Sequence, residues 1–385
     1  MLAHTGGCTR PVRLKGTAHR ADPDTGELSL TYESAREPDG VLLEARQSRR
    51  ATRCPACAAT YRSDARALVR AGLIGGKGIP EDVTGHPLVF ATITGPSFGP
   101  VHTDTRLCHP RPYRCPCGQE DVSDETHEAG DARLGRPLCA EGYHYPGVVI
   151  WNNRVTELWR RTTCCTRRHP AGLLGTTVRA FDQSHRLAYI KVVEYRTRGL
   201  IHLHALLRLD PVTAIEAQSD SAMLAAAVHA AIAQASAPNP LPGFLPIRWG
   251  DRNQVDVVAV DGRQRLPGYL GQVHRQVDRL RRPSRPSAHT RRELPALAVD
   301  DHLRWLVKTC WDLGTDPRLA DCRLRKWAHT LGFRGHWLTK SPNWSTSLTP
   351  LRRARHDYQL ERAGPRDDGI PMADRTYAGS GHQCG

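Results

Sequence analysis

The chain has 385 residues, a mean hydropathy of -0.50 and a formal net charge of +15, from 54 Lys and Arg against 39 Asp and Glu. No run of 18 apolar residues is present, which excludes a membrane-spanning helix, and the start of the chain lacks the pattern of a signal peptide. We therefore expect a cytoplasmic protein of two or three domains. Arginine outnumbers lysine and suits bidentate contact with phosphate, so nucleic acid is the expected partner; a compositional bias of the genome is the alternative source of the charge.

Twelve cysteines are spread along the chain. In the cytoplasm we expect them to be thiols or metal ligands rather than disulfides. Cys54-Pro-Ala-Cys57 has the spacing that lets two thiolates bind one zinc ion, and Cys8 precedes it in the same region. A second cysteine-bearing stretch contains Cys108, Cys115, Cys117 and Cys139. These residues predict structural zinc, with unpaired buried thiols as the alternative for the second stretch.

Hydrophobic periodicity predicts the elements of the chain in order. Helices are expected over 61–73, 151–163, 214–233 and 266–280, and strands over 88–94, 188–197, 200–209 and 254–260. The loop at 75–78 lacks the Ser or Thr that follows the lysine of a phosphate-binding P-loop, which excludes an ATPase motor of that kind.

Composition shifts predict four regions. A cysteine-containing N-terminal region covers 1–85, and a central domain covers 86–280 with a cysteine-rich insert over 108–142. A basic linker and a small helical region follow over 281–355, and the Gly-rich tail over 356–385 is expected to be disordered.

Two apolar runs joined by a turn with Gly199 predict a β-hairpin at the centre of the chain. Because side chains alternate along a strand, His202 and His204 share one face, about 7 Å apart. In an antiparallel pair Glu194 lies opposite them. Two imidazoles and a carboxylate form an open site for a divalent cation, whereas a half-exposed face without a ligand is the alternative.

Basic residues surround this predicted site. Arg196, Arg198 and Arg208 flank the histidines, and Arg275 follows later in the chain. A metal in basic surroundings favours phosphodiester chemistry on an anionic substrate, with a metal-bound water or a side chain as the nucleophile. Tyr269 is the candidate side chain, because a phosphotyrosine bond preserves the energy of the cut strand; the alternative is that it is a packing aromatic.

Three segments, in order, resemble the motifs of HUH-type rolling-circle replication initiators. They are Phe90 to His102, Arg198 to His204 and Tyr269 to Gln272. More closely, the chain resembles the actinobacterial plasmid and integrative-element initiators of the Streptomyces RepSA type, over about residues 8–355, with support from the segment at 325–341.

The resemblance implies an α+β fold in which a central antiparallel sheet with flanking helices forms an RRM-like HUH nicking domain. It implies that Glu194, His202 and His204 hold Mg²⁺ or Mn²⁺, and that Tyr269 attacks the scissile phosphate. The products would be a 5′-phosphotyrosine link and a free 3′-hydroxyl at the origin, which a host polymerase extends with the help of a host helicase.

The chain departs from the family pattern in two places. Gln272 and Val273 stand where the family has a lysine and often a second tyrosine, which favours a single-nucleophile mechanism or a degenerate copy. Gly142 stands where a second cysteine commonly follows Cys139. A mobilisation relaxase is disfavoured because no three-histidine cluster is recognisable. A non-catalytic DNA-binding protein or repressor of the same family remains an alternative.

Overall fold

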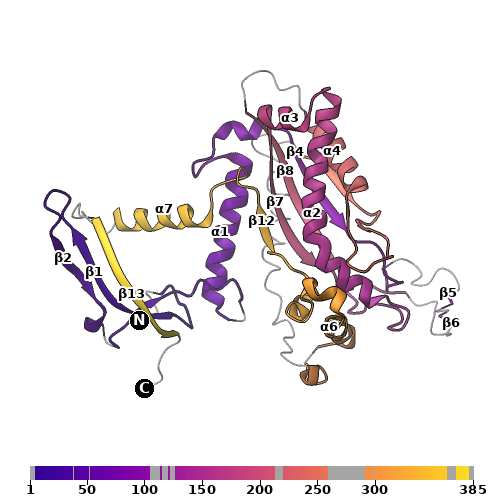
Figure 1. Ribbon diagram of the computed structural model, residues 1–385, viewed down its shortest axis with the longest axis horizontal. Helices are drawn as coiled ribbons and strands as arrows, with labels where there is room; N and C mark the ends of the chain where they lie inside the picture. The colour runs from indigo at the N-terminus through magenta and orange to yellow at the C-terminus, as the bar shows by residue number, and fades with distance from the viewer. Residues whose placement is uncertain are drawn as a thin grey trace. The chain divides into compact units, whose positions relative to one another are not determined.

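The computed structural model describes residues 5–37, 39–51, 53–104, 113–114, 120–121, 126–212, 220–258, 291–297, 299–361 and 370–380. The chain forms two compact units. One consists of Met1–Ala71 with Thr346–Gly385, and the other of Gly72–Ser345 (Figure 1). Within the described residues, no helix combines the length and the hydrophobicity needed to cross a bilayer.

A five-stranded antiparallel sheet is the centre of the larger unit. Its strands lie in the order β11-β4-β8-β7-β12. They are β4 (Leu88–Thr94), β7 (His185–Tyr195), β8 (Ile201–Pro211), β11 (Gln254–Val257) and β12 (Leu338–Lys340). The expected hairpin, the strand at 88–94 and the antiparallel sheet are thus confirmed, and β8 is the middle strand.

Helices cover one face of this sheet. Figure 1 shows α2 (Tyr145–Leu173) and α4 (Ser221–Gln234) lying over the strands. The alternate residues Ile201, Leu203 and Ala205 of β8 join the core formed with these helices. The intervening residues His202 and His204 therefore lie on the opposite face.

The remaining elements of the larger unit are short or lie around the sheet. They are η2 (Glu81–Gly85), β5 (Tyr113–Arg114), β6 (Glu120–Asp121), α3 (Val178–Ser184), β9 (Ser236–Ala237), β10 (Ile247–Arg248), η3 (Arg291–Glu293), α6 (Asp301–Leu313), η4 (Pro317–Cys322) and η5 (Ala328–Thr330). The helix expected over 266–280 lies outside the described residues. The helix expected from 214 is described from Ser221 onward.

The smaller unit contains a sheet in which β1 is central. β13 and β2 flank β1, and β3 also pairs with it. The elements are β1 (Val12–Ala21), β2 (Leu28–Glu33), η1 (Ser34–Arg36), β3 (Leu42–Glu44), α1 (Pro55–Ile74), α7 (Leu348–Glu361) and β13 (Ile370–Ser380). The buried carboxylate of Asp64 in α1 accepts hydrogen bonds from Arg352 and Arg355 of α7.

Two expectations for the C-terminal part of the chain differ from the structure. Composition predicts a disordered tail over 356–385, whereas Ile370–Ser380 forms β13 and pairs with β1 along its length. Composition cannot report this pairing, because its partner lies at the other end of the chain. The sequence predicts a separate helical region within 281–355, yet β12 of this region joins the central sheet. A strand of three residues is too short to show a strand period, so the sequence pattern does not reveal it.

The hairpin turn is fixed to α2 by a buried amide. Asn152 Nδ2 donates to the carbonyls of Gly199 and Leu331 at 2.9 and 3.1 Å, and its Oδ1 accepts from the amide of Ile201 at 3.1 Å. Gly199 has a φ of +77° and a Cβ there would meet Leu306, so the turn requires glycine. These contacts set the start of β8 and therefore the position of His202.

Removal of the Asn152 amide should destabilise the larger unit. Asn152→Ala leaves the buried groups of the turn without partners, and we expect a loss of about 2–4 kcal/mol in the free energy of unfolding. Chemical denaturation measures it, with the exposed Asn343→Ala as the matched control. Equal stability of the two variants would contradict the role of Asn152.

A buried lysine makes the stability of the same unit depend on pH. Burial lowers the pKa of Lys191 from 10.5 to about 8, and its Nζ lies 5.9 Å from the centre of the Trp159 ring. Between pH 8 and 10.5 the unfolded chain holds this proton and the folded chain does not, so stability rises with pH in that window.

Lys191→Met should remove this rise and stabilise the protein at pH 7 by roughly 3 kcal/mol, because the variant has no charged group to bury. Denaturation curves at pH 7 and pH 10 measure the effect. Lys308→Met, at a half-exposed position over Trp305, is the control and should leave the pH dependence unchanged.

Candidate functional site

The histidine pair lies on the middle strand of the central sheet. Glu194 of β7 pairs directly with His202, and Thr94 and Thr92 of β4 pair with His202 and His204. The two imidazole rings are 4.6 Å apart between centroids and inclined by 74°. Both histidines are buried, with 1% and 6% exposure. The structure thus brings the three predicted ligands together on one face.

His204 is held between three neighbours. Its Nε2 lies 3.4 Å from Oε2 of Glu194, and its Nδ1 lies 3.3 Å from Oγ1 of Thr92. The Phe90 ring stacks on the imidazole at 5.8 Å between centroids. The carboxylate of Glu194 and the Nε2 atom of His204 therefore converge on the same small region.

His202 is kept neutral by its surroundings. Burial and the guanidinium of Arg196 lower its pKa to about 3. Nη2 of Arg196 donates to Nε2 of His202 at 3.1 Å, whereas Nδ1 is buried with no hydrogen-bond partner among the described residues. A neutral imidazole is the form that binds a metal ion, but Arg196 must leave Nε2 before a cation can use it.

The donor set fits a divalent cation chemically. Two neutral imidazoles and a carboxylate are ligands that divalent metal ions accept, and they leave coordination positions open. The ligand atoms of these three residues lie farther apart than those of a closed metal site. Among the described residues, one set of three ligand atoms lies within 4.8 Å of one another, and it consists of cysteines of the smaller unit. Closure around a cation requires the Arg196 side chain to move.

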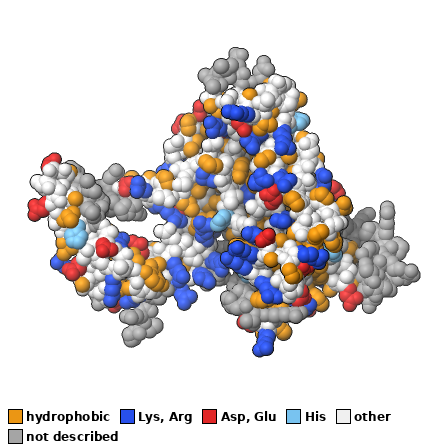
Figure 2. Space-filling model, viewed as in Figure 1, with side chains coloured by type: hydrophobic (Ala, Val, Ile, Leu, Met, Phe, Trp, Pro, Cys, Tyr) orange, Lys and Arg blue, Asp and Glu red, His pale blue; other side chains and the backbone are white. Residues whose placement is uncertain are grey.

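The four arginines expected to contact DNA have different environments. Arg196 is exposed beside His202, and Arg198 is half-buried in the turn, where burial lowers its pKa. Arg208 is 2% exposed, with its guanidinium bound to Asp210 and to the Gly72 carbonyl. We therefore leave Arg208 out of any DNA contact. Arg275 lies outside the described residues. Figure 2 shows many other Lys and Arg side chains on the visible face.

Cys8, Cys54 and Cys57 form a buried cluster in the smaller unit. Their sulfur atoms lie within 4.8 Å of one another. Burial opposes ionisation of Cys54, but N–H groups of Cys57 and Thr9 outweigh it and lower its pKa to about 6. Burial and the two neighbouring thiols raise the pKa of Cys57 to about 11. Thiolates this close together repel one another, and a metal ion bound among them would remove that repulsion. The cluster can therefore hold a metal ion.

The second predicted zinc stretch is only partly described. Cys108, Cys115 and Cys117 lie outside the described residues, and Cys139 is half-buried. Within the residues that the structure describes, no second set of three ligands includes Cys139. A zinc site in the insert stays a prediction. Tyr269 and Gln272 also lie outside the described residues.

Hydrogen bonds link His102, His127 and Asp131 in an arrangement that the sequence pattern does not predict. His102 Nδ1 lies 2.9 Å from Nε2 of His127, and Nδ1 of His127 lies 2.8 Å from Asp131. Arg133 holds the carboxylate of Asp131 in turn. His102 ends the first family-like motif, but nothing in local periodicity links it to His127 across the insert.

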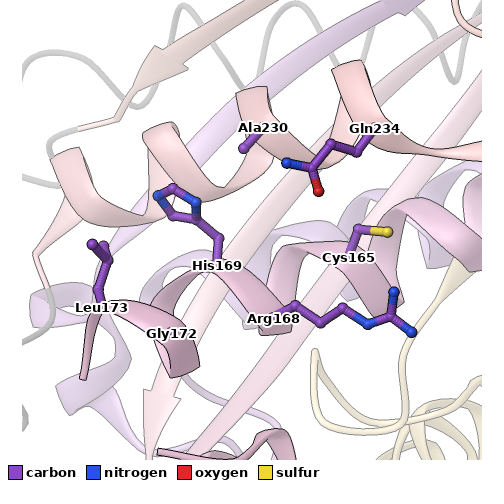
Figure 3. A pocket seen from close by; sticks show the side chains of 7 residues that line it. All are labelled: Cys165, Arg168, His169, Gly172, Leu173, Ala230 and Gln234. Atoms are coloured by element: carbon purple, nitrogen blue, oxygen red, sulfur yellow. The ribbon is translucent and has the colours of Figure 1, made fainter. Parts of the chain in front are cut away.

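The described cavity does not coincide with the histidine face. A hollow of about 360 Å³ lies between α2 and α4, in the helical layer (Figure 3). Its lining residues are Cys165, Arg168, His169, Gly172, Leu173, Ala230 and Gln234. Because these helices cover the opposite side of the sheet, this hollow is no part of the candidate metal site.

Comparison with known proteins agrees with the motifs. A family model described as the replication initiator protein of pSAM2, RepSA, matches residues 1–384. A replication initiator protein of Streptomyces ambofaciens is 38% identical over 421 residues, which cover 100% of this chain and 86% of that protein. No solved structure matches. The resemblance read from the sequence is therefore confirmed, and the chain belongs to the RepSA family of replication initiator proteins.

Proposed function

We propose that this protein starts rolling-circle replication by nicking one strand at the origin of a plasmid or integrative element. Family membership supports the role of a plasmid replication initiator, which acts on origin DNA. The observation that carries the nicking activity is the convergence of Glu194, His202 and His204 on one face of the central sheet. A bound Mg²⁺ or Mn²⁺ would polarise the scissile phosphate there.

Tyr269 is the proposed nucleophile. Its phenolic oxygen forms a bond to phosphorus as the bond to the 3′-oxygen breaks, which leaves a 5′-phosphotyrosine and a free 3′-hydroxyl. The phenolic proton passes to solvent or a nearby base, and the 3′-oxygen acquires one. β11 ends at Val257, which pairs with Val89 of β4 and so lies level with Leu207 of β8, three residues beyond His204. With ~10 Å across two strands and ~10 Å along the strand, the chain leading to Tyr269 starts about 14 Å from His204.

Arg196 and Arg198 are the proposed contacts to the DNA backbone. Arg196 lies at the histidine pair, and its guanidinium is available to a phosphate once a cation takes the Nε2 atom of His202. Host polymerase and helicase are the proposed partners that use the free 3′-hydroxyl and the opened duplex.

A second candidate is a non-catalytic, origin-binding member of the same family. Gln272 favours it, because the family's lysine at this position would place a cation beside the nucleophile and phosphate. Such a protein would bind the origin through its basic surface and leave both strands intact.

A nicking assay separates the two candidates. Supercoiled DNA carrying the element's own origin is incubated with the protein and Mn²⁺, and the covalent protein–DNA adduct is followed by denaturing gel. Tyr269→Phe should abolish the adduct, because the attacking oxygen is lost. Tyr358→Phe, at an exposed position in α7, is the control and should leave the adduct unchanged.

Two outcomes contradict the proposal. An adduct that persists in Tyr269→Phe assigns the nucleophile elsewhere, and intact DNA with the unaltered protein favours the non-catalytic candidate. His204→Ala should lower the nicking rate at least 100-fold, roughly 3 kcal/mol of lost transition-state stabilisation. An unchanged rate in that variant excludes the histidine pair.

The cysteine cluster is proposed to hold structural zinc in the smaller unit. Cys54→Ser should reduce the zinc content by about one ion per chain and lower the thermal unfolding midpoint, since metal binding stabilises only the folded state. Elemental analysis and calorimetry measure both effects. Cys165→Ser, outside the cluster, is the matched control. Unchanged zinc content in Cys54→Ser would contradict the assignment.

A further inference from the structure

We propose that Phe244 and Leu245 form an apolar wedge that stacks against bases of single-stranded DNA beside the nick. The two residues belong to the tip of the β9–β10 hairpin, which consists of residues 238–246. The inference rests on the proposed function, because it assigns the substrate of that same site a further contact.

The two side chains are unusually exposed for their type. Phe244 is 62% and Leu245 86% exposed, whereas Ala237 and Ile247, which pair at the base of the hairpin, are buried in the core. The hairpin is therefore anchored at its base and presents two large apolar groups to water at its tip. Solvation of such groups is unfavourable, which makes their burial against a partner favourable.

The tip is held in this conformation by its own contacts. Asn239 accepts from the amide of Leu241 at 3.1 Å and donates to the carbonyl of Leu245 at 3.2 Å. The amide of Phe244 donates to the carbonyl of Leu241 at 3.4 Å, and four prolines restrict the backbone. A preformed loop loses little conformational entropy on binding, so an exposed aromatic ring on it binds efficiently.

The hairpin packs against α2, where Nε1 of Trp151 donates to the carbonyl of Arg248 at 2.9 Å and Nε1 of Trp249 donates to Oγ1 of Thr162 at 2.8 Å. The chain that follows the hairpin leaves this helical side and joins the sheet beside the strand that pairs with His202. The amide of Gly250 donates to the carbonyl of Thr94 at 2.9 Å, and Oγ1 of Thr94 donates to the carbonyl of Arg252 at 2.8 Å. Thr94 is paired with His202. The step from Gly250 to Thr94 and the step from Thr94 to His202 each span ~5 Å, and the chain from residue 250 to residue 245 spans at most ~3.3 Å for each residue. The backbone of Leu245 therefore lies at most about 27 Å from that of His202.

The chemistry of the hairpin favours nucleic acid over other occupants. Residues 236–250 contain no acidic side chain, and the exposed Arg248 and Arg252 flank the base, with Asp251 between them. An aromatic ring with neighbouring arginines is the combination that binds single strands, because bases stack on the ring while guanidinium groups contact phosphates. A B-form strand advances 3.4 Å for each nucleotide, so a distance of about 27 Å spans roughly eight nucleotides. The base that stacks on the wedge therefore lies at most roughly eight nucleotides from the cut.

Binding without metal tests the wedge independently of catalysis. A fluorescein-labelled single-stranded origin oligonucleotide, with 2-aminopurine placed at successive positions within eight nucleotides of the nick, is titrated with the full-length protein in EDTA. The unaltered protein should quench 2-aminopurine at one or two positions. The double variant Phe244→Ala, Leu245→Ala should lose that quenching and bind about 10-fold more weakly, as expected for one stacked base at ~1.4 kcal/mol.

Two further variants make the result specific. Phe244→Trp keeps an aromatic face and should restore quenching, whereas Leu173→Ala with Leu174→Ala removes two exposed apolar residues from the end of α2 and should leave binding unchanged. Equal affinity and quenching in the double variant overturn the wedge while the Tyr269 adduct assay still stands. Loss of self-association in the double variant, seen by sedimentation, would instead assign the tip to a second copy of this chain. Absence of DNA binding by the unaltered protein overturns both proposals.

Discussion

The alternation of side chains along β8 is the constraint on which the larger unit depends. Ile201, Leu203 and Ala205 must face the helices, because they supply the centre of the core beneath α2 and α4. The same alternation turns His202 and His204 away from the helices. A shift of one residue in register would turn both imidazoles into the apolar core and turn Ile201, Leu203 and Ala205 away from the helices, so the fold's stability also fixes the orientation of the candidate ligands.

The two strands beside β8 place further polar side chains next to the histidines. β7 supplies Glu194 opposite His202, and β4 supplies Thr92 beside His204. The amide of Asn152 fixes the turn between β7 and β8 from the helical side. The site therefore rests on elements that are rigid for structural reasons, which is the arrangement that holds ligands in place with little dependence on loops.

The sequence predicted those parts of the structure that local patterns encode. The alternation around His202 and the Gly199 turn determine the hairpin, so its strands and the position of Glu194 could be inferred. Long-range pairing could not, and β13 was missed because its partner β1 lies at the opposite end of the chain. The sequence pattern also gives no sign that Arg196 is exposed and Arg208 buried, because both flank the histidines in sequence. The structure shows that Arg208 is buried and paired with Asp210.

The contact between Arg196 and His202 limits how the site can work. The Nε2 lone pair of His202 accepts a hydrogen from Arg196 in this structure, and one lone pair cannot serve a guanidinium and a metal ion together. If the proposed cation binds at this atom, Arg196 must be released from it. The released guanidinium would keep its positive charge beside the site, where it would repel a bare cation and attract a phosphate. Under the proposed function, the electrostatics therefore favour a cation that arrives with, or after, the DNA backbone.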